Sequence, residues 1–167
     1  MTDRSKKTFL LSTIIGSFLI YSVVYYTHVF KNAPYDFKEF KSFVIKYGTR
    51  NNMVNYYNSA TGQYDYLNKN DSLIKSHLQL TNADLDSLHR NAADLGLWDF
   101  PDKETSGDTT NSSLVPRYYI EFNYKRKSKQ VTYDANFIGP PKLVEANRAL
   151  IGKIRSILSN AEDRERK

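Results

Sequence analysis

Residues 117–125 read RYYIEFNYK, and this stretch decides the fold of the chain. Its apolar side chains occupy every second position: Tyr118, Ile120, Phe122 and Tyr124. Such alternation is typical of a β-strand that buries one face. The strand predicted here turns Tyr119 and Glu121 toward its other face.

A second strand is predicted directly after the first, across a turn with Lys127 and Ser128 at its tip. The register that matches apolar partners pairs Tyr124 with Val131, Phe122 with Tyr133 and Ile120 with Ala135. A slip of one residue would place every partner on the wrong face. The same register sets Glu121 opposite Asp134 on the outer face, so the two carboxylates would be neighbours.

Short strands are also predicted upstream of this hairpin. They cover residues 40–47, 53–57, 63–67 and 73–80. Gly62 closes the loop between the second and the third, because glycine accepts the positive φ of a short hairpin loop. The first stretch also fits a helical period through Phe37, Phe40, Val44 and Tyr47, so a helix stays open as an alternative there.

The strongest helix signal of the domain follows the fourth strand. Thr81 is a favourable N-cap, Asp84 lies in the first turn, and Gly96 supplies a left-handed stop. The apolar stripe between them consists of Leu85, Leu88, Ala92 and Leu95. These residues predict an amphipathic helix with one buried face.

A second amphipathic helix is predicted from Pro141 to about Asn160, followed by a charged, frayed tail at 161–167. Strands joined by tight turns pair antiparallel, and the helices would cover one face of the sheet. We therefore predict an α+β two-layer domain over residues 37–160, in the order β-β-β-β-α-β-β-α.

A segment of different character precedes this domain. Residues 8–30 contain no Asp, Glu, Lys or Arg over 23 positions. As a helix they would measure about 34 Å, which exceeds the roughly 30 Å hydrocarbon core of a bilayer. We predict a single transmembrane helix over 8–30 that contacts the lipid bilayer, followed by a linker at 31–36.

A cleaved signal peptide is the competing interpretation. It needs an apolar core of about 7–15 residues and small residues at the cleavage site. The segment here is longer and ends in VFKNAP at 29–34, which favours an uncleaved anchor. Equal numbers of cations flank it, three before and three after, but those before are clustered beside the amino terminus. This clustering favours a cytoplasmic tail at 1–7 and an extracytoplasmic domain.

The composition excludes several kinds of site. The chain has 167 residues and no cysteine, which excludes disulfides, cysteine zinc sites, iron–sulfur ligation and lipid-modified cysteine. Half of its net charge of +6 lies in residues 1–31, so the rest is nearly balanced and gives no reason to expect nucleic acid as a partner. Motifs of nucleophilic hydrolases, phosphate-binding loops and zinc proteases are missing from the sequence. We therefore predict no enzymatic activity, no cofactor and no metal.

Few residues remain as catalytic or metal-binding candidates. His28 lies at the membrane edge, His77 in a predicted strand and His89 at the border of a buried helical stripe. Packing or surface placement explains each of them more simply than a role as base. The polar loop from Asp102 follows part of a calcium-loop pattern but has Ser113 where the bidentate Glu belongs, so we predict a solvated loop.

The predicted binding surface lies on the last hairpin. It comprises Tyr119, Glu121, Lys125, Arg126, Lys127, Lys129 and Asp134. A cationic run at a hairpin tip keeps an edge soluble or attracts phosphates. Outward-facing tyrosines are expected at Tyr119 and at one member of each of the pairs Tyr56/Tyr57 and Tyr64/Tyr66, and exposed tyrosine is enriched at protein interfaces.

These features together predict an accessory protein with a single membrane anchor. Its extracytoplasmic domain would contact another protein or an envelope component. Two alternatives stay open: an anchored hydrolase that uses Glu121, Asp134 or a histidine, and a module that binds anionic lipid or another polyanion through the hairpin tip.

Overall fold

The computed structural model describes residues 3–31, 35–107 and 114–166. The chain divides into two compact units, Met1–Tyr35 and Asp36–Lys167. In the first, helix α1 spans Asp3–Lys31. Its residues 3–27 have a mean hydropathy of 1.8 over the most apolar window, none of which is buried in protein. The predicted apolar helix is thus confirmed, and it is long and apolar enough to cross a membrane.

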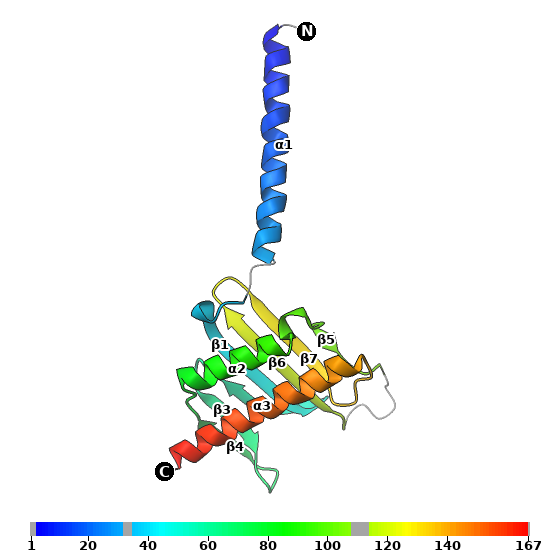
Figure 1. Ribbon diagram of the computed structural model, residues 1–167. Helices are drawn as coiled ribbons and strands as arrows, with labels where there is room; N and C mark the ends of the chain where they lie inside the picture. Colours follow the sequence, from blue (N-terminus) through cyan, green and yellow to red (C-terminus); the bar gives the residue numbers. More distant parts are fainter. Residues whose placement is uncertain (1–2, 32–34, 108–113, 167) are drawn as a thin grey trace. The chain divides into compact units, whose positions relative to one another are not determined.

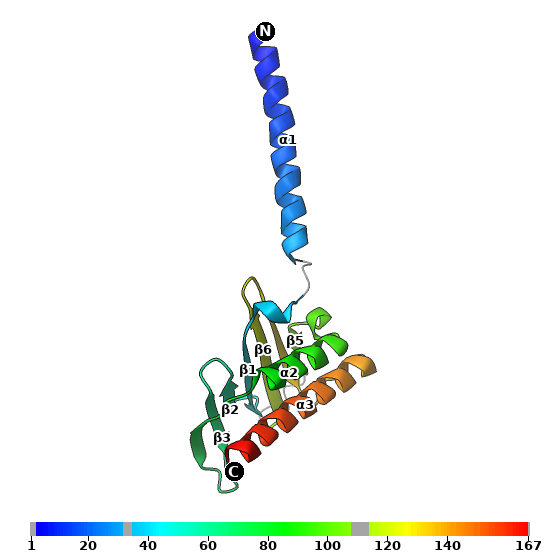
Figure 2. The same ribbon diagram turned by 60° about the vertical axis from the view of Figure 1, so that its left-hand side comes forward.

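The second unit is a seven-stranded mixed sheet with two helices on one face (Figures 1 and 2). Its strands are β1 (Phe40–Thr49), β2 (Asn52–Asn58), β3 (Gln63–Leu67), β4 (Leu73–His77), β5 (Lys103–Glu104), β6 (Pro116–Tyr124) and β7 (Ser128–Asp134). The helices are α2 (Asn82–Asp94) and α3 (Pro141–Glu165), with short 3-10 turns η1 (Phe37–Glu39) and η2 (Leu97–Asp99). The predicted α+β two-layer fold is confirmed.

The strand order is β4-β3-β2-β1-β6-β7-β5, so the chain returns to the middle of the sheet with β6. Neighbouring strands pair antiparallel except β5 and β7, which are parallel. Two of the predicted elements need correction. Strand β5 lies in a segment predicted as loop, and β4 ends at His77 rather than at residue 80. The alternative of a helix at 40–47 is wrong, because β1 pairs with both β2 and β6 there.

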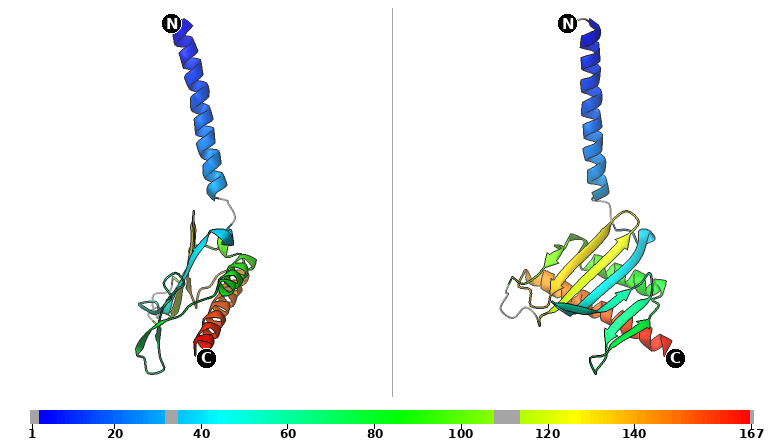
Figure 3. Two further views of the ribbon diagram at one scale, coloured as in Figure 1. Left: turned by 90° about the vertical axis from the view of Figure 1, so that its left-hand side faces the viewer. Right: turned by 180° about the vertical axis from the view of Figure 1, so that it is seen from behind.

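The core lies between the sheet and the two helices. Alternate residues of the central strands are buried there, as the alternation at 117–125 predicted, and they meet the apolar stripes of α2 and α3. The largest contributors are Phe43, Tyr57, Phe122, Tyr133, Leu88 and Leu150. The left panel of Figure 3 shows both helices on one side of the sheet, so the opposite face carries no helix.

The register of the last hairpin differs from the predicted one by four residues. Ile120 pairs with Val131, and Tyr118 pairs with Tyr133. The turn lies two residues earlier than predicted, with Lys125 and Arg126 at its tip, since Tyr124 donates its amide to the Lys127 carbonyl at 2.9 Å and residues 128–130 join the ladder. A shift of four keeps every side chain on its predicted face, but the predicted opposition of Glu121 and Asp134 is wrong.

Helix α2 begins as the sequence predicts. The Thr81 hydroxyl accepts from the Asp84 amide, and the Asp84 carboxylate accepts from the Thr81 amide in return, which completes a capping box. Gly96 has a φ of 77° just after the helix, a conformation that glycine adopts without strain. Leu97 is buried directly beyond it.

The predicted frayed tail at 161–167 is wrong over most of its length, because α3 continues to Glu165. Ala161 is buried in the core. Arg164 forms an ion pair with Asp84 at 2.5 Å, and Glu165 accepts from the Gln79 amide at 3.0 Å. Residues 161–165 therefore form an ordered end of α3, and their contacts link this helix to the start of α2 and to the segment after β4.

Candidate functional site

The right panel of Figure 3 shows the sheet from the side without helices, the open face. Strand pairing brings residues of β2, β1, β6 and β7 side by side on this face. On β1, Lys46 lies directly between Tyr56 of β2 and Tyr119 of β6. One row further, Val44 pairs with Glu121, which pairs with Gln130 of β7. We call Lys46, Tyr56, Tyr119, Glu121 and Gln130 the open-face cluster.

Lys46 occupies the centre of this cluster. Its Nζ atom lies 5.7 Å from the ring centroid of Tyr56 and 5.7 Å from that of Tyr119. At such distances the negative face of an aromatic ring attracts a cation. Two rings and one ammonium thus form a continuous row across β2, β1 and β6. The Asn58 side-chain amide donates to the Tyr56 hydroxyl at 3.1 Å, and this bond orients the Tyr56 ring.

Tyr119 connects this row to the polar side of the cluster. Its hydroxyl lies 2.8 Å from Glu121 Oε2 and 3.1 Å from Gln130 Oε1, two acceptors for one hydrogen. Burial raises the pKa of Tyr119 to about 12, and the hydrogen bond to Glu121 adds to the rise. The phenol is therefore neutral at physiological pH and serves as a fixed donor. The cluster can stack and form hydrogen bonds, which suits recognition.

The cationic run of the last hairpin is partly neutralised within the domain. Arg126 binds Glu39 through two nitrogens, Nη2 to Oε1 at 2.8 Å and Nε to Oε2 at 3.0 Å. Lys129 lies on the helix side of β7, where its ammonium donates to the Phe100 carbonyl and to Asp102 Oδ1 at 3.0 Å. The side chain of Lys129 is therefore nine-tenths buried and does not contribute to the predicted binding surface at the hairpin tip.

The two other lysines of the run lie at the turn. Lys125 is exposed and its amide donates to the Glu39 carbonyl at 2.9 Å. Lys127 is half-buried, and burial lowers the pKa of its ammonium, as does the neighbouring Arg126. Because Arg126 and Lys129 are bound to acceptors in the domain, the tip is a weaker positive patch than its sequence indicates.

Asp134 is fully buried rather than exposed on the outer face. It pairs in register with Arg117, which donates to it through Nε at 2.6 Å and Nη2 at 3.0 Å. Arg50 adds a bond at 2.6 Å and the Ser106 amide another at 3.1 Å. Burial alone would raise the pKa of Asp134, but these donors outweigh it and the pKa is lowered. Asp134 is thus a permanently charged structural centre in the domain, and it shares no proton with Glu121.

The histidines take structural positions where their side chains are described. His89 is buried and its Nδ1 lies 2.8 Å from the Tyr124 hydroxyl. Burial lowers the pKa of this imidazole, so it is held neutral. His77 is exposed on β4, and its ring occupies the space that a side chain at position 62 would need, which explains Gly62. The side chain of His28 lies outside the described residues.

The prediction of a solvated loop at 102–113 needs correction at one residue. Glu104, at a would-be ligand position, is fully buried and bonded to Asn147 of α3 at 2.5 Å. Residues 108–113 lie outside the described part of the chain. Within residues 3–31, 35–107 and 114–166, no group of three or more acidic or histidine side chains is placed to hold a metal ion.

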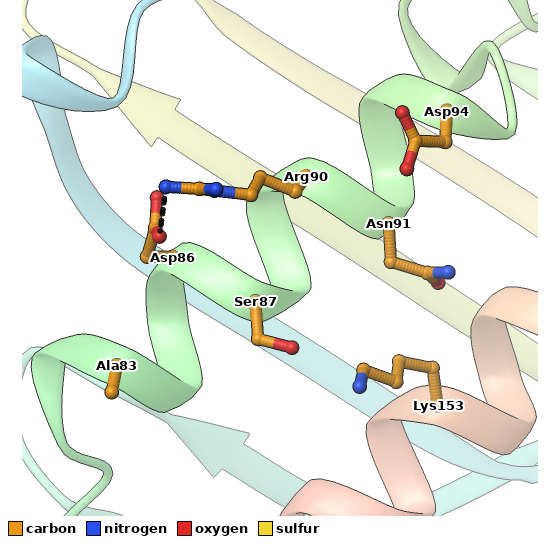
Figure 4. A pocket seen from close by; sticks show the side chains of 7 residues that line it. All are labelled: Ala83, Asp86, Ser87, Arg90, Asn91, Asp94 and Lys153. Carbon is orange, nitrogen blue, oxygen red and sulfur yellow. Dashed lines mark ion pairs between the residues drawn. The ribbon is translucent and has the colours of Figure 1, made fainter.

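A polar groove runs between α2 and α3 (Figure 4). Its volume is about 480 Å³, and Lys153 of α3 reaches across toward Ser87 and Asn91 of α2. Asp86 and Arg90 on its rim neutralise one another at 2.8 Å. The groove is widely open and presents balanced charges, so its chemistry favours water over any one class of ligand.

Sequence reasoning found Tyr119 and Glu121 of the open-face cluster and missed Lys46 and Gln130. It expected either Tyr56 or Tyr57 to face outward, and Tyr56 does, while Tyr57 is buried. The expectation for Tyr64 and Tyr66 was wrong, because residues two apart on one strand share a face and their rings lie 5.0 Å apart. Alternation in 40–47 signals that Lys46 faces outward, but nothing local signals which strand lies beside it.

Comparison of the chain with protein-family models, with curated proteins and with solved structures found no match.

Proposed function

We propose that this chain is a single-pass membrane protein whose domain binds another protein through the open-face cluster. The observation that carries the proposal is the row of Tyr56, Lys46 and Tyr119 across three adjacent strands, on the sheet face without a helix. Tyrosine offers a large, rigid contact area together with a polar hydroxyl, and it is enriched among the residues that dominate binding energy.

The charges of the cluster suggest the chemistry of the partner. Among the described residues no carboxylate lies within 4.0 Å of Lys46, while Glu121 is already engaged by the Tyr119 hydroxyl. A partner surface with a carboxylate opposite Lys46 and polar groups opposite Gln130 would complement this face. The rings on both sides of the ammonium would shield such an ion pair from water.

The membrane part of the proposal is supported by helix α1 and by the distribution of charge around it. Arg4, Lys6 and Lys7 stand within one turn or two of the amino terminus. Clustered cations near a first apolar helix favour retention in the cytoplasm. We therefore assign residues 1–7 to the cytoplasm and the α+β domain to the other side of the membrane, as in an anchored protein of a bacterial-type envelope.

The assigned topology predicts a labelling pattern that the absence of cysteine makes easy to read. A single cysteine at the exposed position Ser159 should react with a membrane-impermeant maleimide in right-side-out membrane vesicles and stay unlabelled in inside-out ones. A single cysteine at Ser5 is the matched control and should show the reverse. Labelling of Ser159→Cys confined to inside-out vesicles would refute the orientation.

Binding through the open face predicts site-specific photo-crosslinking in native membranes. A photoreactive phenylalanine analogue at Tyr56 should give one discrete protein adduct, because the ring faces outward beside Lys46. Adding Lys46→Glu in the same chain should reduce that adduct at least about tenfold, since charge reversal places like charges opposite one another.

The control is the same analogue at Ser159, an exposed position on α3. It should give no corresponding adduct. Equal yield at Ser159, or a Tyr56 adduct indifferent to Lys46→Glu, would count against the open face as the binding surface. A slow-migrating adduct of twice the chain's own mass would identify the partner as a second copy.

A further inference from the structure

A second concavity lies on the opposite, helix-bearing face of the sheet. It is formed by the end of β1, the start of β2 and the start of β6, and α3 closes one side. Its volume is about 310 Å³, at the lower end of the range found for small-molecule sites. Tyr47, Tyr118 and Arg155 supply aromatic and charged groups to it. The other lining residues are Gly48, Thr49, Asn52, Val54, Asn55, Leu67 and Pro116.

The two tyrosines line this cavity side by side. Tyr47 and Tyr118 are paired in register on β1 and β6, and their rings stack with centroids 6.1 Å apart and planes 19° apart. Burial raises the pKa of Tyr47, although the positive charge of Arg155 opposes the rise. The Tyr47 phenol is therefore neutral, and the stacked rings present a flat surface with a hydroxyl edge.

Arg155 projects from α3 onto the same pair of rings. Its guanidinium carbon lies 5.7 Å from the Tyr118 ring centroid, and Nη2 donates to the Tyr118 hydroxyl at 2.7 Å. This one bond leaves the other N–H groups of the guanidinium for a ligand. Among residues 3–31, 35–107 and 114–166, no carboxylate lies within ion-pair distance of Arg155.

The two partly buried arginines of the described domain, Arg50 and Arg117, share the carboxylate of Asp134. Arg155 is exposed at the rim of the cavity, where the bond to the Tyr118 hydroxyl orients its guanidinium, and no described residue supplies it with an anion. A carboxylate is the group that matches the fork of an arginine, through two parallel hydrogen bonds.

We propose that this cavity binds a carboxylate carried on an aromatic or branched apolar group, with the carboxylate on Arg155 and the apolar group against the rings of Tyr47 and Tyr118. A free carboxylic acid and the carboxyl terminus of a peptide both have this chemistry. The site is independent of the open-face cluster, since it uses the opposite face of the sheet.

The experiment is a ligand titration of the full-length chain in detergent micelles. Binding is monitored through the amide NMR shifts of Tyr47, Gly48 and Tyr118. Three probes separate the possibilities: N-acetylphenylalanine, its uncharged amide, and the peptide Ala-Ala-Ala-Phe with a free carboxyl terminus. Saturable shifts with the acid and at least about tenfold weaker binding of the amide are expected, because a charge-assisted bond to Arg155 is lost. Tighter binding of the peptide than of N-acetylphenylalanine would identify the carboxyl termini of proteins as the ligand. Equal affinity for the two would identify free carboxylic acids.

Arg155→Gln should weaken binding of N-acetylphenylalanine at least about tenfold. The matched control is Arg148→Gln, two helical turns away on the exposed surface of α3, which should change the affinity less than about twofold. Arg155 is exposed, so the fold of the variant is expected to survive, and unchanged NMR shifts away from the cavity will verify this. Equal affinity for acid and amide, or no effect of Arg155→Gln, overturns the proposal.

Discussion

Replacing Asp134 with alanine should lower the free energy of unfolding by about 3–5 kcal/mol. The side chain is fully buried and receives bonds from Arg117, from Arg50 and from the Ser106 amide. Its removal leaves two guanidinium groups close together, each less than a quarter exposed. The loss combines the broken bonds with the repulsion of two cations that no longer share an anion.

Unfolding in urea can be followed through Trp98, the only tryptophan of the chain. Its ring packs edge-on against Phe122 and Tyr124, so its fluorescence reports on the domain even when α1 is held in a detergent micelle. Asp102→Ala is the matched control. That carboxylate also binds a cation, Lys129, but is 66% exposed, and its loss should cost less than about 1 kcal/mol. An Asp134→Ala chain as stable as the control would contradict the structural role.

The pH dependence of this variant provides a second check. The folded state lowers the pKa of Asp134 below the ordinary value of 3.8. As the pH falls, the unfolded chain therefore takes up the proton before the folded chain does. The carboxylate's contribution to stability is complete above about pH 4 and is lost as the pH falls through the lower pKa of the folded state. The difference in stability between the wild type and Asp134→Ala should accordingly be constant from pH 5 to 8 and shrink only in stronger acid.

Asp134 also illustrates which parts of the fold local sequence can predict. The start of α2 depends on Thr81 and Asp84, three residues apart, and was predicted correctly. The buried face of β6 depends on a period of two and was also predicted correctly. Arg50 and Asp134 are separated by 84 positions, and no local pattern links them.

The errors in the last hairpin and in β5 have related causes. A four-residue shift preserves the alternation of faces, so apolar matching alone cannot choose between two registers that both keep Ile120 and Phe122 inside. The two registers differ in the position of the turn, which has Lys125 and Arg126 at its tip rather than Lys127 and Ser128. Strand β5 has two residues, Lys103 and Glu104, and a segment of this length is too short to show a periodic pattern. Its existence depends on β7, which follows it by more than twenty positions.

The burial of Glu104 was not predicted either, because it depends on the pairing of β5 with the distant β7. The buried carboxylate is part of an unfavourable polar cluster in the core. Glu104 is fully buried between β5 and α3, where Oε2 accepts from the Asn147 amide at 2.5 Å. The second carboxylate oxygen has no hydrogen-bond partner among the described residues, nor has Asn147 Oδ1 or the Tyr133 hydroxyl. Burial raises the pKa of Glu104 to about 7, although Asn147 and the charge of Lys129 oppose the rise.

Glu104→Gln should therefore stabilise the protein, and by an amount that grows with pH. Between the ordinary pKa of 4.5 and the folded value of about 7, the folded chain holds the proton more tightly than the unfolded chain. Wild-type stability consequently falls as the pH rises through this window, by about 3 kcal/mol in total above pH 7. Glutamine has no charge to bury and brings a donor for one of the unpaired oxygens while its carbonyl still accepts from Asn147.

In urea unfolding followed by Trp98 fluorescence, Glu104→Gln should exceed the wild type by about 3 kcal/mol at pH 8 and by no more than about 1 kcal/mol at pH 5. Glu104→Ala distinguishes the effect of the charge from that of the contacts, because it removes the same charge but leaves a cavity and an unpaired Asn147 amide. Relative to the wild type, it should therefore gain less stability than Glu104→Gln at pH 8 and lose stability at pH 5. Glu145→Gln, on the exposed side of α3, should leave the pH profile unchanged. A Glu104→Gln chain less stable than wild type at pH 8, or a difference independent of pH, would mean that the ionised carboxylate is itself favourable in the core.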